Sequence, residues 1–85
     1  MLIDIVNVSP HPDFSLHLEF KNGENRRFDM APYMDQKPWS RLKTGDIFLA
    51  ARVEYGTVVW PGNIDIDPET LYDYSTPLYK DVIGS

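Results

Sequence analysis

The 85-residue sequence contains no cysteine, which excludes disulfide bridges and thiolate metal sites and disfavours a stapled secreted scaffold. It also lacks any apolar run near the roughly 20 residues that a membrane-spanning helix needs. Residues 1–4 show neither the basic start nor the long apolar stretch of a signal peptide. These absences favour a cytoplasmic protein without membrane contact.

Basic charge is scarce as well. The chain has 8 Lys and Arg against 13 Asp and Glu, a formal net charge of -5, and such a surface repels nucleic-acid phosphates. The imbalance is uneven, because residues 21–52 carry 7 basic and 4 acidic side chains, while residues 61–85 carry 5 acidic side chains and one lysine. Nucleic-acid binding is therefore disfavoured. The alternative is nucleic-acid binding through a basic patch of Arg26, Arg27, Arg41 and Lys43, and such binding would be sensitive to salt.

The length suits one domain, and a hydrophobic content of 42% with 25% charged residues is ordinary for a globular chain. The sequence has no internal repeats, and its seven prolines divide it into short elements. We expect a single domain over residues 1–75, followed by a flexible C-terminal tail over residues 76–85.

Three strands are expected in the first third of the chain. Residues 2–8 are rich in β-branched side chains, and because both sides are apolar this strand is either buried on both faces or carries a bulge. Residues 14–20 alternate, so one face is buried and the other polar. The buried set is Phe14, Leu16, Leu18 and Phe20, and the polar set is Ser15, His17 and Glu19. Residues 26–30 form the third strand.

The turn between the second and third strands is predicted from the facing of their side chains. An Asn-Gly pair usually marks a two-residue hairpin loop, here Asn22-Gly23. That register would place Phe28 on the polar face of the preceding strand. A three-residue loop over residues 21–23 instead pairs Leu16 with Phe28 and unites the two apolar faces. We therefore predict a type I turn with Gly23 in the left-handed conformation as a bulge.

The rest of the chain reads as short elements. Pro38 suits the first position of a short helix that Gly45 ends, with Trp39 and Leu42 facing inward. Residues 47–55 and 57–60 are expected to form a hairpin around Gly56. Its buried face would hold Ile47, Leu49, Ala51 and Val53, with Val59 as a cross-strand neighbour.

A final helix is expected after this hairpin. Pro61 cannot continue a central strand, so residues 60–63 leave the sheet. Asp67, Pro68 and Glu69 suit the start of a helix. The predicted fold is a small α+β domain of antiparallel hairpins in the order β-β-β-α-β-β-α, with short helices packed on the sheet.

No catalytic, cofactor-binding or metal-ligating set emerges. His11 and His17 have no cysteine or regularly spaced carboxylate beside them and are interpreted as ordinary polar residues. Asp65, Asp67 and Glu69 alternate like calcium ligands, but Pro68 interrupts the pattern and a helix-capping turn explains them.

An interaction surface is the most suggestive feature. Aromatic side chains near the Trp60-Pro61 corner are either core residues with polar tips or anchors for a protein partner. The candidate surface comprises Trp60, Pro61, Asn63, Asp65 and Tyr72.

These motifs together resemble a bacterial family, the domain-of-unknown-function family numbered 2442. The matching residues are Leu16, Leu18, Phe20, Asn22 and Gly23, then Phe28-Asp29-Met30, Phe48, Trp60-Pro61, Asn63, Asp65 and Leu71-Tyr72. The resemblance implies a compact α+β domain with no established activity. Some members carry a further helix-turn-helix domain, for which this chain stops too soon. Some are encoded beside another small protein, in an arrangement similar to toxin–antitoxin pairs.

We therefore expect a non-enzymatic protein-interaction module without a cofactor, an antitoxin-like or regulatory partner of another small bacterial protein. The alternative is a small-molecule or enzymatic site near Trp60, Asp65 and Tyr72. The oligomeric state stays open, since an exposed first or last strand could pair with a second copy.

Overall fold

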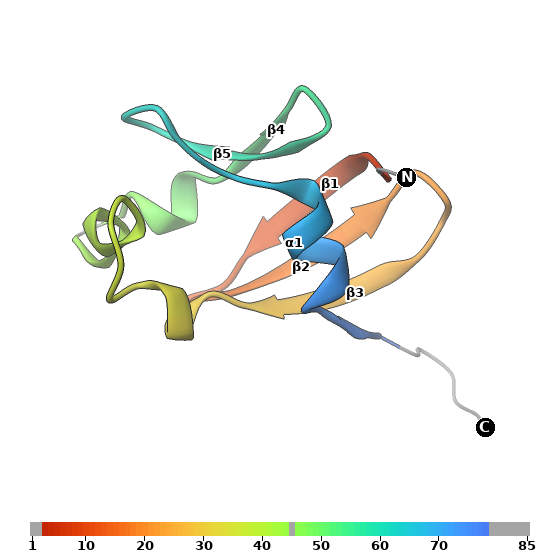
Figure 1. Ribbon diagram of the computed structural model, residues 1–85, viewed down its shortest axis with the longest axis horizontal. Coiled ribbons are helices and arrows are strands. Elements are labelled where there is room, and N and C mark those ends of the chain that lie inside the picture. Colours follow the sequence, from red (N-terminus) through yellow and green to blue (C-terminus); the bar gives the residue numbers. More distant parts are fainter. Residues whose placement is uncertain (1–2, 45, 79–85) are drawn as a thin grey trace.

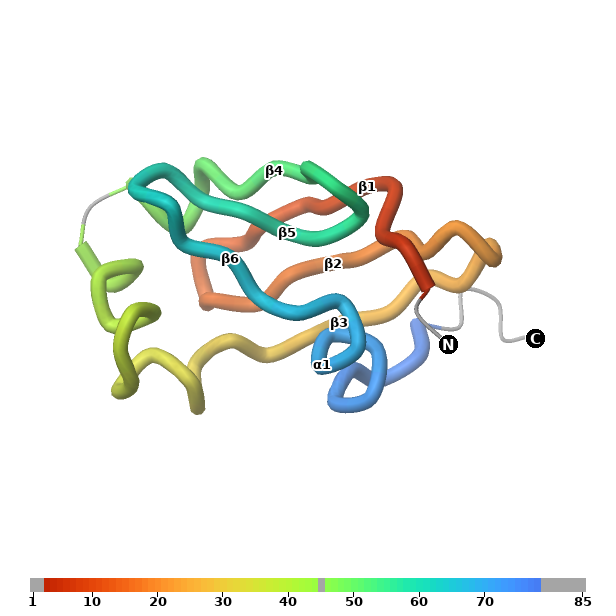
Figure 2. Tube along the Cα trace, turned by 45° about the horizontal axis from the view of Figure 1, so that its top comes forward, coloured from red at the N-terminus to blue at the C-terminus, as the bar shows by residue number. Residues whose placement is uncertain are grey.

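Two antiparallel sheets enclose one hydrophobic core in the computed structural model, which describes residues 3–44 and 46–78 (Figure 1). The first sheet has the order β1-β2-β3-β7, and the second has the order β4-β5-β6. Figure 2 shows the hairpins of the second sheet lying over β1 and β2, and β1 contacts both β4 and β5. The predicted α+β class with antiparallel hairpins is confirmed.

The strands are short and the helices shorter still. The first sheet consists of β1 (Ile5–Pro10), β2 (Ser15–Phe20), β3 (Asn25–Asp29) and β7 (Thr76–Pro77). The second consists of β4 (Arg52–Glu54), β5 (Thr57–Trp60) and β6 (Ile64–Ile66). Three 3-10 helices, η1 (Ala31–Tyr33), η2 (Trp39–Lys43) and η3 (Phe48–Ala50), and the helix α1 (Pro68–Asp73) complete the described part. None of these helices is long and apolar enough to cross a membrane.

The first strand is bulged. β1 begins and ends later than the predicted residues 2–8, and its pairing with β2 shifts between Ile5 and Asn7. Of the two alternatives for this strand, the bulge is confirmed. Val6 and Asn7 are both exposed between the buried Ile5 and the partly buried Val8, because the extra residue interrupts the strict alternation of the strand.

The hairpin of β2 and β3 has the predicted three-residue loop. Leu16 lies opposite Phe28, and the Phe20 amide donates to the Glu24 carbonyl. Gly23 adopts a φ of 92°, the left-handed conformation that was expected. Matching of apolar faces therefore overrides the two-residue preference of the Asn-Gly pair.

The start of β2 differs from the prediction. Phe14 has a φ of 66° and lies in the preceding turn, although its ring still packs against the core. Ser15, predicted to face solvent, is buried, and its hydroxyl donates to Asp13 Oδ1 at 2.6 Å. The turn rotates both side chains away from the simple alternation.

The prediction of a strand over residues 47–55 is wrong for its first half, where η3 forms. Phe48 is buried and its ring stacks on Trp60, with centroids 6.0 Å apart. Leu49, assigned to the buried face, is 47% exposed. The helical turn directs the larger aromatic ring inward, whereas a strand with Leu49 inside would have exposed it.

The second sheet contains a third strand that was not predicted. The chain leaves β5 at Pro61 as expected, but it turns back over residues 61–63 and pairs as β6. Gly62 and Asn63 both adopt positive φ, which makes this tight return possible. The order β4-β5-β6 therefore replaces the single hairpin, and Ile64 and Ile66 add to the core.

The two predicted helices form, with differences at their ends. Pro38 precedes η2, whose Leu42 is buried; Gly45 lies outside the described residues. Asp67 precedes α1, but its side chain makes no capping hydrogen bond. The expected domain boundary at residue 75 falls just before β7, which pairs with β3, and residues 79–85 lie outside the described part.

Candidate functional site

Trp60, the centre of the predicted surface, is a core residue. Its side chain is 1% exposed, and its indole N–H donates to the Phe48 carbonyl at 3.0 Å. Buried tryptophan needs such a partner for its polar edge. The Trp60 side chain therefore stabilises the corner as part of the core and is not available to a partner at the surface.

The rest of the corner faces outward. Pro61, Asn63 and Asp65 are exposed and border a shallow hollow of about 280 Å³ on the outer face of the second sheet. Strand register places Arg52 opposite Val59 and Val59 opposite Asp65, so these three side chains form one row across that face. Three of the five residues of the predicted surface, Pro61, Asn63 and Asp65, therefore lie exposed on one face of the molecule.

The segment containing η2 braces this corner. The Trp39 indole N–H donates to the Asp65 carbonyl at 3.0 Å. Arg41 lies against Gly62, where an added Cβ would come within 2.9 Å of the guanidinium Nη2. The guanidinium is the end of an exposed, flexible side chain and can move, so it is the φ of 90° that favours glycine at position 62.

Tyr55 is a surface residue that the sequence analysis assigned to a strand. It forms a two-residue loop with Gly56, closed by the opposed pair Glu54 and Thr57. Both loop residues have positive φ, 54° for Tyr55 and 76° for Gly56, as a type I′ turn requires. The Tyr55 side chain is 98% exposed. The signal was present, since Gly56 was recognised as a turn residue, but a two-residue turn needs Tyr55 as well.

Tyr72 lies away from the corner, in a clamp that joins α1 to the β2–β3 hairpin. Its hydroxyl donates to Glu24 Oε2 at 2.7 Å, and the Arg26 guanidinium carbon lies 4.5 Å from its ring centroid. Arg26 Nη1 donates to Glu24 Oε1 at 2.8 Å, and Arg26 also bonds Ser75. The Tyr72 hydrogen bond, followed by Arg26, lowers the pKa of Glu24, and the same bond raises the pKa of Tyr72.

Three of the four residues of the alternative basic patch have carboxylate partners. Besides Arg26 with Glu24, Arg27 lies 3.5 Å from Asp13 and Lys43 lies 2.9 Å from Asp35. These pairs reduce the positive field that a phosphate backbone would meet.

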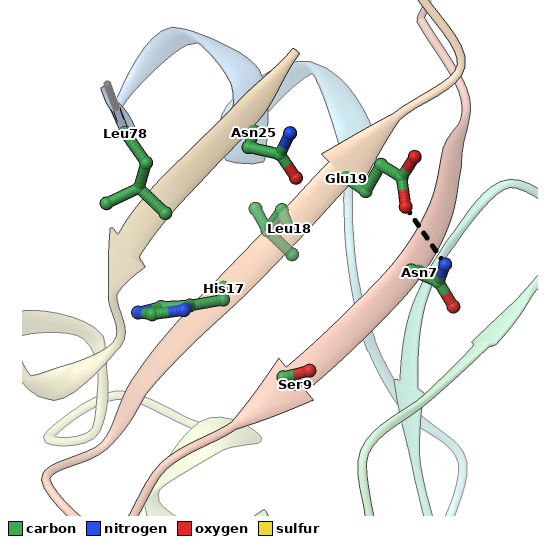
Figure 3. A pocket seen from close by; sticks show the side chains of 7 residues that line it. All are labelled: Asn7, Ser9, His17, Leu18, Glu19, Asn25 and Leu78. Atoms are coloured by element: carbon green, nitrogen blue, oxygen red, sulfur yellow. Dashed lines mark hydrogen bonds between the residues drawn. The ribbon is translucent and has the colours of Figure 1, made fainter. Parts of the chain in front are cut away.

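A groove of about 550 Å³ lies on the outer face of the first sheet (Figure 3). Leu18 of β2 lies beneath it, with its own side chain buried on the core side. The remaining lining residues are Asn7, Ser9, His17, Glu19, Asn25 and Leu78. We call this feature the sheet groove.

Register explains why polar side chains meet there. Asn7 lies opposite Glu19, and Glu19 lies opposite Asn25, so these three form one row across β1, β2 and β3. Ser9 and His17 begin the next row on the same face. Alternation over residues 14–20 predicts the polar face of His17 and Glu19, but a single sequence does not show which side chains lie beside them on neighbouring strands.

The two histidines, interpreted as separate polar residues, are in contact. Their ring centroids lie 4.2 Å apart at an interplanar angle of 50°. The pKa of His17 is lowered by desolvation and then by the charges of His11 and Arg27, with Asp13 opposing. Within residues 3–44 and 46–78, no group of three or more His, Asp or Glu side chains is arranged to hold a metal ion.

Residues 5–77 match the model of a family described as "Protein of unknown function (DUF2442)". This match covers the two sheets from the start of β1 to the end of β7. Comparisons with the curated proteins and with the solved structures give no significant match.

Proposed function

We propose that this chain, which belongs to the DUF2442 family, is a non-enzymatic interaction module that binds another small bacterial protein. The contact is made by the outer face of the second sheet and the tip of its first hairpin. We call this the hairpin surface, and it consists of Arg52, Glu54, Tyr55, Pro61, Asn63 and Asp65. The module acts in the bacterial cytoplasm, which agrees with its cysteine-free composition.

Tyr55 is the observation that carries the proposal. Its side chain is 98% exposed, so it adds almost nothing to the core. Its backbone has a φ of 54°, at a position of a type I′ turn where asparagine or glycine is favoured. The left-handed conformation costs a residue with a Cβ roughly 1–2 kcal/mol. A large aromatic side chain kept at this cost, at the tip of a hairpin, suits an anchor that is buried by a partner.

The surroundings of Tyr55 suit a polar rim. Arg52 Nε donates to Glu54 Oε2 at 2.6 Å, and the carboxylate of Asp65 lies in the same row as Arg52. Protein interfaces commonly place such charged groups around an aromatic centre. An antitoxin-like or regulatory role is the specific form of the proposal, and it rests on what the family resemblance implies.

Site-specific photo-crosslinking tests this surface. A benzophenone amino acid is placed at position 55, and the full chain is co-expressed with the product of the neighbouring gene. Position 74 is the matched control, because Tyr74 is 70% exposed but lies at the end of α1. We expect cross-links from position 55 and not from position 74. Equal cross-linking at both positions, or none at position 55, would contradict the proposal.

The alternative is a small-molecule or enzymatic site near Trp60, Asp65 and Tyr72. Trp60 is buried and Tyr72 is held in its clamp with Glu24, whereas Asp65 borders the shallow hollow beside Pro61. A metabolite screen by ligand-observed NMR separates the two functions. A hit from this screen that also shifts the amide of Asp65 in a ¹H–¹⁵N spectrum of the labelled protein would favour the alternative.

A further inference from the structure

Polar side chains line the sheet groove, and each of them carries at least one hydrogen-bond acceptor. Asn7 Nδ2 donates to Glu19 Oε1 at 3.0 Å, and in Figure 3 the remaining Asn7 oxygen points away from β2. Within the described residues, the side chains of Ser9, His17 and Asn25 make no hydrogen bond. In Figure 3 the Asn25 oxygen points towards the middle of β2. The open side of the groove therefore offers acceptors from three strands.

The charge of the groove has one sign. Among the described residues that line it, Glu19 is the only carboxylate, and none is lysine or arginine. Arg27 lies opposite His17 in the neighbouring row, but its charge is offset by Asp13 at 3.5 Å. The lowered pKa of His17 favours its neutral form near pH 7. A cation that enters the groove therefore meets the Glu19 carboxylate, whose charge is not neutralised by any lysine or arginine among the lining residues.

The arrangement of the acceptors favours one kind of cation, a guanidinium group. Glu19 and Asn25 are register partners on β2 and β3, and Ser9 lies on β1 opposite His17, with neighbouring strands about 5 Å apart. A guanidinium is planar and presents five N–H donors in a fixed fork, which can reach acceptors on neighbouring strands at once. Leu78 forms an apolar wall at one side of the groove, against which the methylene stem of an arginine can pack.

We propose that the sheet groove binds an arginine side chain of a partner protein, with Glu19 as the charged contact and Ser9 and Asn25 as further acceptors. The net charge of -5 favours the approach of such a basic segment. The groove lies on the face of the first sheet that the second sheet leaves uncovered. The inference therefore goes beyond the hairpin surface, and either site can fail without the other.

The test is a titration of the ¹⁵N-labelled full chain with acetyl-Gly-Arg-Gly-amide, followed by NMR. We expect concentration-dependent shifts of the amides of residues 7, 9, 17–19 and 25, and weaker binding at higher salt. The peptide with citrulline in place of arginine keeps the shape and loses the charge. It should bind about tenfold more weakly or not at all.

Variants make the result specific to Glu19. Glu19→Gln keeps an oxygen for the Asn7 amide and removes the charge, so binding should weaken about tenfold or more with little change in Tm. Glu69→Gln, on the exposed surface of α1, makes the same change in net charge and should leave binding unaltered. Equal binding of the citrulline peptide, equal loss in both variants, or shifts at these residues caused only by self-association of the chain would overturn the proposal.

Discussion

Replacement of Tyr55 by asparagine should make the protein more stable. Tyr55 has a φ of 54°, and its side chain is 98% exposed, so the change removes backbone strain and sacrifices almost no burial. Relief of part of the left-handed penalty is worth about 1 kcal/mol, since asparagine tolerates this conformation better than tyrosine. For a domain of this size, that gain corresponds to an increase in Tm of about 4–8 °C.

The measurement is thermal unfolding by circular dichroism, supported by urea unfolding to show that the m-value is unchanged. Tyr74→Asn is the control, because Tyr74 is also exposed but has an ordinary φ of -109°. The control should show no gain. A Tm of Tyr55→Asn at or below that of the parent chain would refute the reasoning, because it would mean that Tyr55 stabilises the fold. A stabilised variant that loses its partner would separate the interaction role from folding.

Three further results are expected. Gly23→Val should lower the free energy of unfolding by about 1–2 kcal/mol or more, because its φ of 92° is unfavourable for a β-branched residue even though a Cβ there has no atom within 4 Å; an unchanged Tm would count against the turn. Tyr72→Phe should cost about 0.5–1.5 kcal/mol and raise the pKa of Glu24, measured by NMR titration, since the bond that lowers that pKa is lost; a constant Glu24 pKa would exclude this cause. The pKa of His17 is lower in the folded chain than its ordinary 6.5, so the unfolded chain binds more protons and stability should decrease as the pH falls below about 6.5. His17→Gln should reduce this decrease, and an identical pH profile would show that His17 does not contribute.

The first hairpin was predictable because its information is local. Strict alternation over residues 14–20 fixes which side chains of β2 face inward, and only the three-residue loop lets Phe28 join them. The start of α1 was equally local, since proline and two acidic residues favour a helix there. Such signals lie within a few residues of the structure that they specify.

The errors arose where tertiary packing decides between local alternatives. An apolar run from residue 47 is compatible with a strand or a helical turn, and the stacking of Phe48 on Trp60 selects the turn. β6 has only three residues, too few to show a period. The clamp of Tyr72 with Glu24 joins residues 48 positions apart, which no spacing rule in a single sequence reveals.

In the candidate site, too, some features follow from local sequence and others depend on tertiary packing. The exposure of Asn63 follows from its place in the turn after Pro61, and that of Asp65 from alternation within β6, a strand that was not predicted. The burial of Trp60 depends on a carbonyl acceptor in η3, where a strand was predicted. The sheet groove also depends on register, because Asn7 and Asn25 approach Glu19 only after β1 and β3 have paired with β2.

The hydrogen bond from Trp39 to Asp65 has a consequence for growth of the second sheet. β6 is an edge strand, and an unprotected edge can template the addition of a further strand and start aggregation. Here the Trp39 indole N–H donates to the Asp65 carbonyl at 3.0 Å. Asp65 is the middle residue of this three-residue strand, so its carbonyl already has a hydrogen-bond partner. An incoming chain would have to displace that ring before it could pair. This edge is therefore closed to strand addition, and recognition on this side of the molecule is left to side chains.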